Sequence, residues 1–342
     1  MIAECELSLL ILLCVTQEQV EWVVKCINEF KQMKSNNATP LVSVAVMAYN
    51  SAGTIIETLE SVKAQTYTRL ELVIGDDGSK DDTISLCCEW IAKNEERFER
   101  VELLENPINQ GTSVNYNRVM DACQGVWVKD LDGDDLLNAD CIEQFIAYIQ
   151  NNPDSNYIFC RVQGFTKEGD KIVLKNIEAF NYDFFQWPVD KQLHYLLFER
   201  NCVPSPGLFY NLTKVREIGL RNDERIYLLE DWPKWINALR MGLHFSFIDE
   251  TLVMYRVGNG ISTSNMLLPR YYETCRRFVM LYQYPEWIKT DPEDAMERIV
   301  AHEMHIYDVF YQLNRRYQTT THSYAYRLGK WLLKPIKWIT KG

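Results

Sequence analysis

Strand-like and helix-like segments alternate along residues 41–135, and this alternation constrains the fold more than any other feature of the chain. Four short apolar runs have the length and β-branched character of buried strands: Leu41–Met47, Leu70–Gly75, Val101–Leu104 and Val126–Leu131. Segments with a helical spacing of apolar residues separate them. This order predicts an α/β domain with a mainly parallel sheet and helices on both faces, because parallel neighbours need a crossover connection.

Local signals predict where the first helices begin and end. Thr54 and Glu57 have the spacing of a capping box, in which two side chains satisfy the first amides of a helix. A second helix is expected to start within Ser79–Asp82, where acidic residues suit a first helical turn. A third helix is expected over Ser113–Cys123, before Gly125.

The pattern after residue 150 is less regular but still predicts several elements. Tyr157–Phe165 and Lys171–Leu174 are expected to pair as a hairpin. Asp231–Met241 has the pattern of a helix, and Phe245–Tyr255 that of one or more strands. Residues 265–328 are expected to be helical.

The composition narrows the class of protein. A chain of 342 residues can form one large domain, with or without an appendage. Its formal net charge of −11 disfavours a nucleic-acid-binding protein, which would need a basic surface. The ten cysteines include no C-x-x-C pair, so we expect buried, reduced thiols and no zinc site.

The two ends of the chain differ from its middle. Residues 1–39 are expected to be an N-terminal extension and linker; one hypothesis places the native start at Met33, and the alternative is a helix packed on the domain. No apolar run reaches the roughly 18 residues needed to span a bilayer, and we find no export signal, so we predict a cytoplasmic protein. Arg327–Lys341 carries five basic residues and no acidic one. This composition predicts peripheral contact with an anionic membrane surface, and the alternative is a tail packed on the domain.

Three carboxylates directly follow the fourth predicted strand: Asp132, Asp134 and Asp135. Ligands of open parallel sheets lie at the carboxyl ends of the strands. Carboxylates so close together repel one another unless they share a cation, and hard oxygen ligands suit Mg²⁺ or Mn²⁺. The alternative is an acidic turn that caps a helix.

Two further acidic pairs are candidates for the same site. Asp76 and Asp77 end the second predicted strand and so belong to the same edge of the sheet; the alternative is a turn with a helix N-cap at Ser79. Glu230 and Asp231 begin a predicted helix, where a carboxylate can act as a cap or as a general base.

These blocks together resemble glycosyltransferase family 2. The resemblance covers about residues 41–262 and is carried by Ser43–Asn50, Leu59–Tyr67, Leu72–Thr83, Asn109–Gly111, Asn117, Gly125, Leu131–Asp135, Glu230–Trp232, Tyr255–Arg256 and Ile261–Ser262. It implies the GT-A fold, a Rossmann-like mixed sheet, over residues 40–262, followed by a helical C-terminal region with a basic tail over residues 263–342. It also implies an inverting enzyme that uses a nucleotide-sugar donor, which we expect to be UDP-linked, together with Mg²⁺ or Mn²⁺.

The resemblance also implies roles for individual residues. Asp134 would be the main metal ligand, assisted by Asp132, and Asp231 would be the general base, with Glu230 as the second candidate. Donor binding is expected at Ala48, Tyr49, Asn50, Asp76, Asp77, Asn117, Lys129, Asp132 and Arg256. Of these, Lys129 and Arg256 are candidates for contact with the diphosphate, although Lys129 could equally face solvent from its strand.

The chain departs from the family pattern in two places. Met47 stands where the family usually has Pro, and Gly258 stands where it often has a His that could contact the metal. No Q-x-x-R-W motif occurs in the sequence, so we expect one sugar to be transferred per encounter, to a saccharide or a lipid-linked saccharide of a bacterial surface polymer. The alternatives are a non-catalytic nucleotide- or sugar-binding relative with the same fold, and a nucleotidyltransferase.

Overall fold

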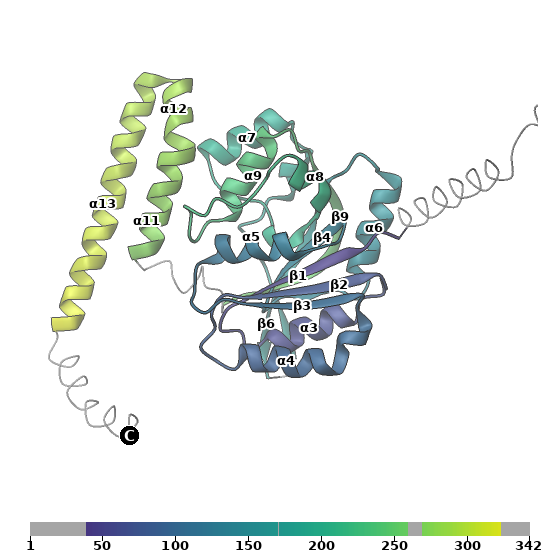
Figure 1. Ribbon diagram of the computed structural model, residues 1–342. Helices are drawn as coiled ribbons and strands as arrows, with labels where there is room; N and C mark the ends of the chain where they lie inside the picture. The colour runs from purple at the N-terminus through teal and green to yellow at the C-terminus, as the bar shows by residue number, and fades with distance from the viewer. Residues whose placement is uncertain (1–38, 170, 259–268, 323–342) are drawn as a thin grey trace, which may run out of the picture.

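The computed structural model describes residues 39–169, 171–258 and 269–322. One mixed sheet forms its centre, with the strand order β3-β2-β1-β4-β8-β6-β9-β5, and β7 pairs with β6 (Figure 1). The parallel half of the sheet comes from the first part of the chain: β3, β2, β1 and β4 all run in the same direction. Antiparallel pairing of β8 with β4 and with β6 extends this half into a mixed sheet, as predicted.

The strands agree with the predicted runs to within a residue or two in the first half of the chain. Their bounds are Val42–Ala48 (β1), Leu70–Asp76 (β2), Arg100–Glu105 (β3), Trp127–Asp132 (β4), Leu136–Leu137 (β5), Tyr157–Glu168 (β6), Lys171–Lys175 (β7), Leu208–Asn211 (β8) and Phe245–Arg256 (β9). The predicted hairpin is confirmed as the antiparallel pair of β6 and β7. Strand β8 was not expected, because it is only four residues long and stands between polar segments.

Helices cover both faces of the sheet, as the alternation predicts. Their bounds are Ile55–Lys63 (α3), Thr83–Asn94 (α4), Thr112–Ala122 (α5), Cys141–Asn151 (α6), Val189–Phe198 (α7), Leu212–Glu217 (α8) and Asp231–Arg240 (α9). Side chains of α3, α4 and α6 share one buried cluster with one face of the sheet. Side chains of α5, α7, α8 and α9 share the other cluster.

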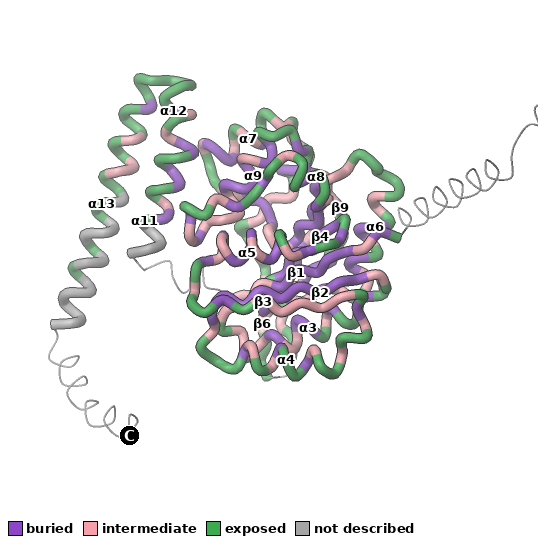
Figure 2. Tube along the Cα trace, in the orientation of Figure 1, coloured by how far each residue is buried: buried purple, intermediate pink, exposed green. Residues whose placement is uncertain are grey.

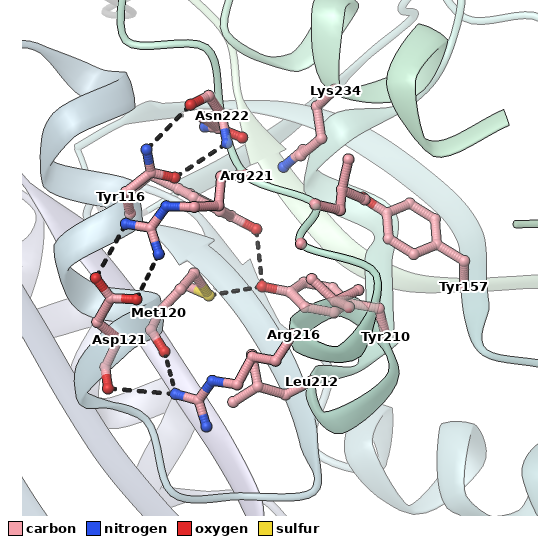
Figure 3. A pocket seen from close by; sticks show the side chains of 14 residues that line it. Tyr116, Met120, Asp121, Tyr157, Tyr210, Leu212, Arg216, Arg221, Asn222 and Lys234 are labelled. Atoms are coloured by element: carbon pink, nitrogen blue, oxygen red, sulfur yellow. Dashed lines mark hydrogen bonds and ion pairs between the residues drawn. The ribbon is translucent and has the colours of Figure 1, made fainter. Parts of the chain in front are cut away.

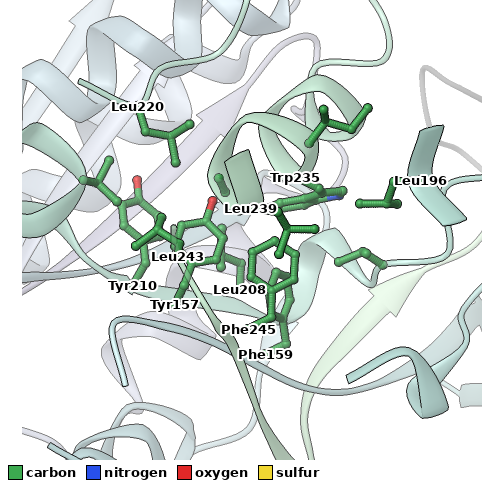
Figure 4. Close-up of a cluster of buried hydrophobic side chains, with 14 of the residues drawn as sticks. Tyr157, Phe159, Leu196, Leu208, Tyr210, Leu220, Trp235, Leu239, Leu243 and Phe245 are labelled. Carbon is green, nitrogen blue, oxygen red and sulfur yellow. The ribbon is translucent and has the colours of Figure 1, made fainter. Parts of the chain in front are cut away.

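The alternation of side chains along β1 explains the two clusters. Val42, Val44 and Val46 point to the face covered by α3 and α4, whereas Ala45 belongs to the cluster under α5. Both faces are buried, so the strand reads as a continuous apolar run in the sequence. The buried band along the strands is visible in Figure 2, and Figure 4 shows the aromatic centre of the second cluster around Trp235.

Two predicted helix starts are wrong in detail. Thr54 precedes α3, but its hydroxyl donates to the carbonyl oxygens of Ser51 and Gly133 and caps no amide, while Glu57 pairs with a lysine and an arginine. The second helix begins at Thr83, so residues 79–82 lie in the preceding loop. There the hydroxyl of Ser79 is bonded to Asp76. In both places the side chains take tertiary partners in preference to the local helix amides.

A helical C-terminal region packs beside the domain, as predicted. It comprises Pro269–Phe278 (α11), the π-helical turn Val279–Gln283 (η4), Tyr284–Thr290 (α12) and Pro292–His322 (α13). Its first helices lie beside α7 and α9 (Figure 1). Phe278, Val279 and Tyr282 join the same buried cluster as side chains of α7 and α9. Within the described residues, no helix is both long and apolar enough to cross a membrane.

Three predictions concern segments that the structure does not describe. The extension and the proposed start at Met33 lie within residues 1–38, the loop at Ile261–Ser262 lies within residues 259–268, and the basic tail Arg327–Lys341 lies within residues 323–342. The domain boundaries at 39–40 and 262–263 therefore stay predictions. The described cysteines are free thiols, and most of them are buried, as expected.

Substituting Ala for Gly75 should destabilise the fold by about 1–3 kcal/mol, because overpacking a close contact forces backbone or side-chain shifts. A Cβ at residue 75 would lie 2.1 Å from a methyl group of Val119 on α5. Gly53→Ala is the matched control, since a Cβ there meets nothing within 4 Å. Urea denaturation of both variants measures the difference in the free energy of unfolding; equal stabilities would show that α5 does not pack on β2 this closely.

Candidate active site

A cavity of about 590 Å³ lies at the carboxyl ends of β1, β2 and β4. The loop after β1, the start of α5, the turn after β4 and the start of α9 form most of its wall. It therefore lies where parallel α/β sheets bind their ligands. Eight predicted residues line it: Ala48, Tyr49, Asn50, Asp77, Asp132, Asp134, Glu230 and Asp231.

The loop after β1 is shaped by Asn50. Its φ of 50° is in the left-handed region, which Asn tolerates better than most residues. The side-chain oxygen of Asn50 accepts from the backbone amide of Lys80. The backbone amide of Asn50 donates to the hydroxyl of Ser79. These bonds tie the loops after β1 and β2 together, so Tyr49 and Asn50 are held at the edge of the cavity.

Asp76 and Asp77 have different positions, although they are adjacent in sequence. One carboxylate oxygen of Asp76 accepts from the amides of Gly78 and Ser79, so this side chain shapes the loop and does not line the cavity. Asp77 does line the cavity, and its carboxylate accepts from the amides of Gln110 and Gly111 at 2.9 and 2.8 Å. Asp77 thereby holds the loop before α5 against the end of β2.

The turn after β4 presents two carboxylates to the cavity, those of Asp132 and Asp134. The third, Asp135, is buried, and one of its oxygens accepts from the amide of Arg256 while the other has no partner among the described residues. Desolvation by the surrounding protein raises the pKa of Asp132 above the usual range for an aspartate. The charges of Asp134 and Glu230 raise this pKa further. Burial also raises the pKa of Asp134. A bound cation would offset the electrostatic repulsion between these carboxylates.

Arg256 does not line the cavity, contrary to the prediction that it could contact the diphosphate. Its guanidinium is buried against the ring of Phe165, pairs with Glu57 at 2.7 Å and donates to the backbone oxygen of Asp134 at 2.8 Å. Arg256 therefore holds the acidic turn in place from behind. The sequence could not show this, because the contact joins residues that are 122 positions apart.

Lys129 is fully buried and also lies outside the cavity lining. Its ammonium donates to the backbone oxygens of Asp130 and Pro206 and lies 3.6 Å from the carboxylate of Asp130. Neither predicted alternative, a diphosphate contact or a solvent-facing lysine, describes this position. The lysine joins β4 to the segment before β8.

Asn117 is not in the cavity either. Its side-chain amide donates to Asn222 and Glu224, and its side-chain oxygen accepts from the amide of Asn222. It lines a smaller cavity of about 120 Å³ on the far side of Tyr116 and Lys234, whose walls include the ion pair of Asp121 with Arg221 (Figure 3). Asn117 thus holds the segment that leads into α9, and the predicted donor contact is not supported.

Glu230 and Asp231 face the cavity where α9 begins. Glu230 accepts from the hydroxyl of Thr112 at 3.0 Å. Asp231 accepts from the side-chain amide of Asn201 at 2.9 Å and from the backbone amide of Trp232 at 2.8 Å. Burial raises the pKa of both carboxyl groups; the charge of Asp231 adds to the effect at Glu230, whereas the charge of Lys234 opposes it at Asp231.

Lys234 is a functional candidate that the sequence analysis missed. It follows Asp231 by one helical turn, lines the cavity, and is only 4% exposed. Its ammonium lies 3.8 Å from a carboxylate oxygen of Asp130 and 4.2 Å from the ring centre of Tyr116. Burial lowers the pKa of Lys234, and the charges of Asp130, Asp231, Glu230 and Asp132 oppose that shift. The signal in the sequence was a lysine one helical turn after the candidate base Asp231.

The donor set of this site fits a divalent metal only together with a ligand. In the parts of the chain that the structure describes, no group of three His, Cys, Asp or Glu side chains could hold a metal ion. Asp132 and Asp134 offer hard oxygen donors on one turn. Mg²⁺ is commonly held by one or two carboxylates with substrate phosphates completing its coordination. The two aspartates therefore fit a metal that is bound jointly with a diphosphate.

The matching family model is described as "Glycosyl transferase family 2", and it matches residues 43–209. This range runs from β1 into β8 and includes the acidic turn after β4. Glu230 and Asp231 lie beyond it. Among similar curated proteins is the UDP-Glc:alpha-D-GlcNAc-diphosphoundecaprenol beta-1,3-glucosyltransferase WfaP of Escherichia coli, which is 25% identical over 226 residues. That match covers 66% of this chain and 80% of WfaP.

Two solved structures share the fold at low sequence identity. The structure of residues 1–349 of S. aureus TarS in complex with UDP-GlcNAc superposes with a TM-score of 0.55 at 19% identity, covering 73% of this chain and 67% of that one. The mannosyltransferase PcManGT from Pyrobaculum calidifontis, in complex with GDP-Man and Mn²⁺, gives 0.50 at 15% identity and covers 88% and 83%. Residues 43–209 therefore form a glycosyl transferase family 2 domain, and the protein is a glycosyltransferase with the GT-A fold.

Proposed function

We propose that this enzyme transfers one sugar from a nucleotide-sugar donor to a saccharide acceptor, with inversion at the anomeric carbon. The observation that supports this most is the arrangement of one cavity, which contains both the acidic turn after β4 and the acidic start of α9. An inverting displacement needs these two functions together: charge stabilisation on the side of the leaving group, and a base on the side of the acceptor.

In this proposal Asp231 takes the proton of the acceptor hydroxyl as its oxygen bonds to the anomeric carbon. The bond between that carbon and the donor phosphate oxygen breaks at the same time, and the electron pair leaves with the nucleoside diphosphate. Asp231 is the preferred base because two hydrogen bonds orient its carboxylate, whereas Glu230 accepts from Thr112. Tyr49, Asn50 and Asp77 would bind the nucleoside.

Asp134, with Asp132, would hold Mg²⁺ or Mn²⁺. When bound, the metal would neutralise negative charge on the departing diphosphate. Lys129, Arg256, Asp76 and Asn117 have no direct part in the proposal, because none of them lines the cavity. These four side chains hold in place the loops and the turn that carry the proposed nucleotide-binding and metal-binding residues.

We propose a UDP-linked donor and a lipid-linked saccharide acceptor. The support is the name of WfaP, which specifies UDP-Glc as donor and a diphosphoundecaprenol-linked GlcNAc as acceptor. The fold alone does not determine the nucleotide base of the donor, since the TarS structure contains UDP-GlcNAc and the PcManGT structure contains GDP-Man. A lipid-linked acceptor would suit an enzyme on the inner face of the plasma membrane, with the basic segment Arg327–Lys341 as its contact.

Calorimetric titration of UDP, GDP and TDP into the full chain tests this proposal, with Mn²⁺ in one series and EDTA in the other. We expect UDP to bind in the presence of Mn²⁺ and its affinity to fall strongly in EDTA, because a metal held by Asp134 and Asp132 would neutralise charge on the diphosphate. If GDP or TDP bound more tightly than UDP, the nucleotide base of the donor would be different from the one proposed. Failure of every nucleotide to bind in both series would contradict the proposed donor site.

A further inference from the structure

Asn201 is the side chain outside α9 that contacts the carboxylate of Asp231. It lies in the segment between α7 and β8, and its amide nitrogen donates to Oδ2 of Asp231 at 2.9 Å. No motif in the sequence points to it, because the two residues are 30 positions apart and belong to different elements. Asn201 is half-buried, so the bond is partly shielded from water.

The direction of the Asn201 amide is fixed by a second hydrogen bond. Its side-chain oxygen accepts from the backbone amide of Val203 at 3.2 Å, so the nitrogen is left to face Asp231. Asn201 therefore presents a donor to the carboxylate and not an acceptor.

The backbone on both sides of this contact is anchored. After Asn201, the carbonyl of Pro206 accepts from the buried ammonium of Lys129 at 2.8 Å. Before it, the carbonyl of Leu196 at the end of α7 accepts from the indole of Trp232 at 2.8 Å, which joins α7 to the start of α9. Asn201 and Asp231 thus belong to segments that are fixed relative to one another.

The two carboxylate oxygens of Asp231 each have one fixed donor. Oδ1 accepts from the amide of Trp232 at 2.8 Å, and Oδ2 accepts from Asn201. Because a carboxylate oxygen can accept two hydrogen bonds, each keeps a lone pair for an acceptor hydroxyl. Two donors on different oxygens define the plane of the group and so the direction of that lone pair.

We propose that Asn201 is a positioning residue, which holds the carboxylate of Asp231 in the orientation that accepts the proton of the acceptor. The proposal rests on the proposed role of Asp231 as the general base. Hydrogen bonds to the charged form of a carboxyl group favour that form.

The charged and titratable groups around Asp231 support this role for Asn201. Burial raises the pKa of Asp231, and the largest opposing influences are the charge of Lys234 and the bond from Asn201. Glu230 and Lys234 face it from α9, and Tyr255 faces it from β9. Asn201 is thus a neutral donor that opposes the effect of burial without bringing a charge into the site.

Two variants test the proposal: Asn201→Ala, which removes the donor, and Asn201→Asp, which keeps the shape and sets a second carboxylate against Oδ2. The measurement is the pH dependence of kcat/KM for release of nucleoside diphosphate from nucleotide sugars that carry the nucleotide found by the calorimetric screen. We expect the acidic limb to move to higher pH by about one unit in the Ala variant and by more in the Asp variant. At neutral pH kcat should fall about tenfold in the Ala variant, with little change in the donor KM.

Asn152→Asp is the matched control, because it adds the same charge at an exposed helix end; we expect it to leave the pH profile unchanged. Calorimetric titration of UDP with Mn²⁺ checks that the donor site is intact in each variant. Unshifted acidic limbs in both Asn201 variants would overturn the proposal. Loss of UDP binding in both would overturn it too, since Asn201 would then support the structure of the whole site.

Asp231→Asn separates this inference from the proposed function. If Asp231→Asn retains activity, the assignment of the base fails whatever the Asn201 variants do. If Asp231→Asn is inactive while the Asn201 variants keep the pH profile of the native enzyme, the base stands and the positioning role of Asn201 fails.

Discussion

Asp231→Asn should lower kcat about a thousandfold while UDP still binds with close to native affinity. General-base catalysis contributes about 10²–10⁴ to a rate, and the amide of Asn cannot take up the acceptor proton. The change preserves the shape of the side chain, and the amide of Trp232 can still donate to the oxygen that remains. The proposed nucleotide contacts are in other parts of the cavity lining, at the loop after β1 and the turn after β4.

Glu230→Gln is the comparison that distinguishes the two carboxylates. Glu230 is adjacent in sequence, lines the same cavity and is bonded to Thr112, so its substitution should cost much less than that of Asp231. If Glu230→Gln were the more damaging change, the base would be Glu230. If neither variant reduced kcat, the base would have to come from the acceptor or from another part of the cavity.

The same assignment predicts the pH dependence of the native enzyme. Burial raises the pKa of Asp231, and the residue must be deprotonated to accept a proton. Activity should therefore fall as the pH drops through this raised pKa, at a higher pH than for an exposed aspartate. An acidic limb at the usual aspartate range would contradict a buried base.

Asp134→Ala should weaken Mn²⁺-dependent binding of UDP by about a hundredfold or more, because Asp134 would hold the metal, whose charge stabilisation would contribute several kcal/mol. The backbone of the turn should survive the change, since Arg256 donates to the main-chain oxygen of Asp134 and not to its carboxylate. Calorimetry with Mn²⁺ and with EDTA measures the effect, and the remaining affinity should be the same in both series.

Asp154→Ala is the control for the second prediction, because it removes an exposed aspartate that does not line the cavity. It should bind UDP with native affinity and keep the dependence on Mn²⁺. A variant of Asp134 that still required Mn²⁺ would show that the metal is held elsewhere. A native protein that bound UDP equally well in EDTA would remove the metal from the proposal altogether.

The first half of the fold could be read from the sequence because its signals are local. Buried parallel strands are continuous apolar runs, and the pattern of β1, β2 and β4 placed them within a residue of their observed ends. The acidic residues at these strand ends could therefore be placed close together, because the carboxyl ends of parallel strands lie at the same edge of the sheet. Short strands such as β8 carry too little pattern to be recognised and form because neighbouring strands offer them partners.

The errors in the predicted site have a common cause. Asn117, Lys129 and Arg256 each have a partner in a distant segment that turns the side chain away from the cavity, and Asp76 instead bonds the loop that directly follows it. Sequence proximity placed their backbones correctly but not their side chains. Buried polar groups take the hydrogen-bond partners that the tertiary structure supplies, so their direction is a property of the whole fold.

The sequence by itself determined the class of fold, because strand and helix patterns alternate along it, and it placed acidic residues at the strand ends and at the start of α9. The family followed from the resemblance of motifs spread over residues 41–262. Only the tertiary structure decided which carboxylates share a cavity and which cationic side chains lie close to them. Asn201 contacts Asp231 from a separate loop, and Lys234 on α9 lies against Asp130 on β4. No periodicity in the chain records such contacts, because they arise only when α7, α9 and the sheet pack together.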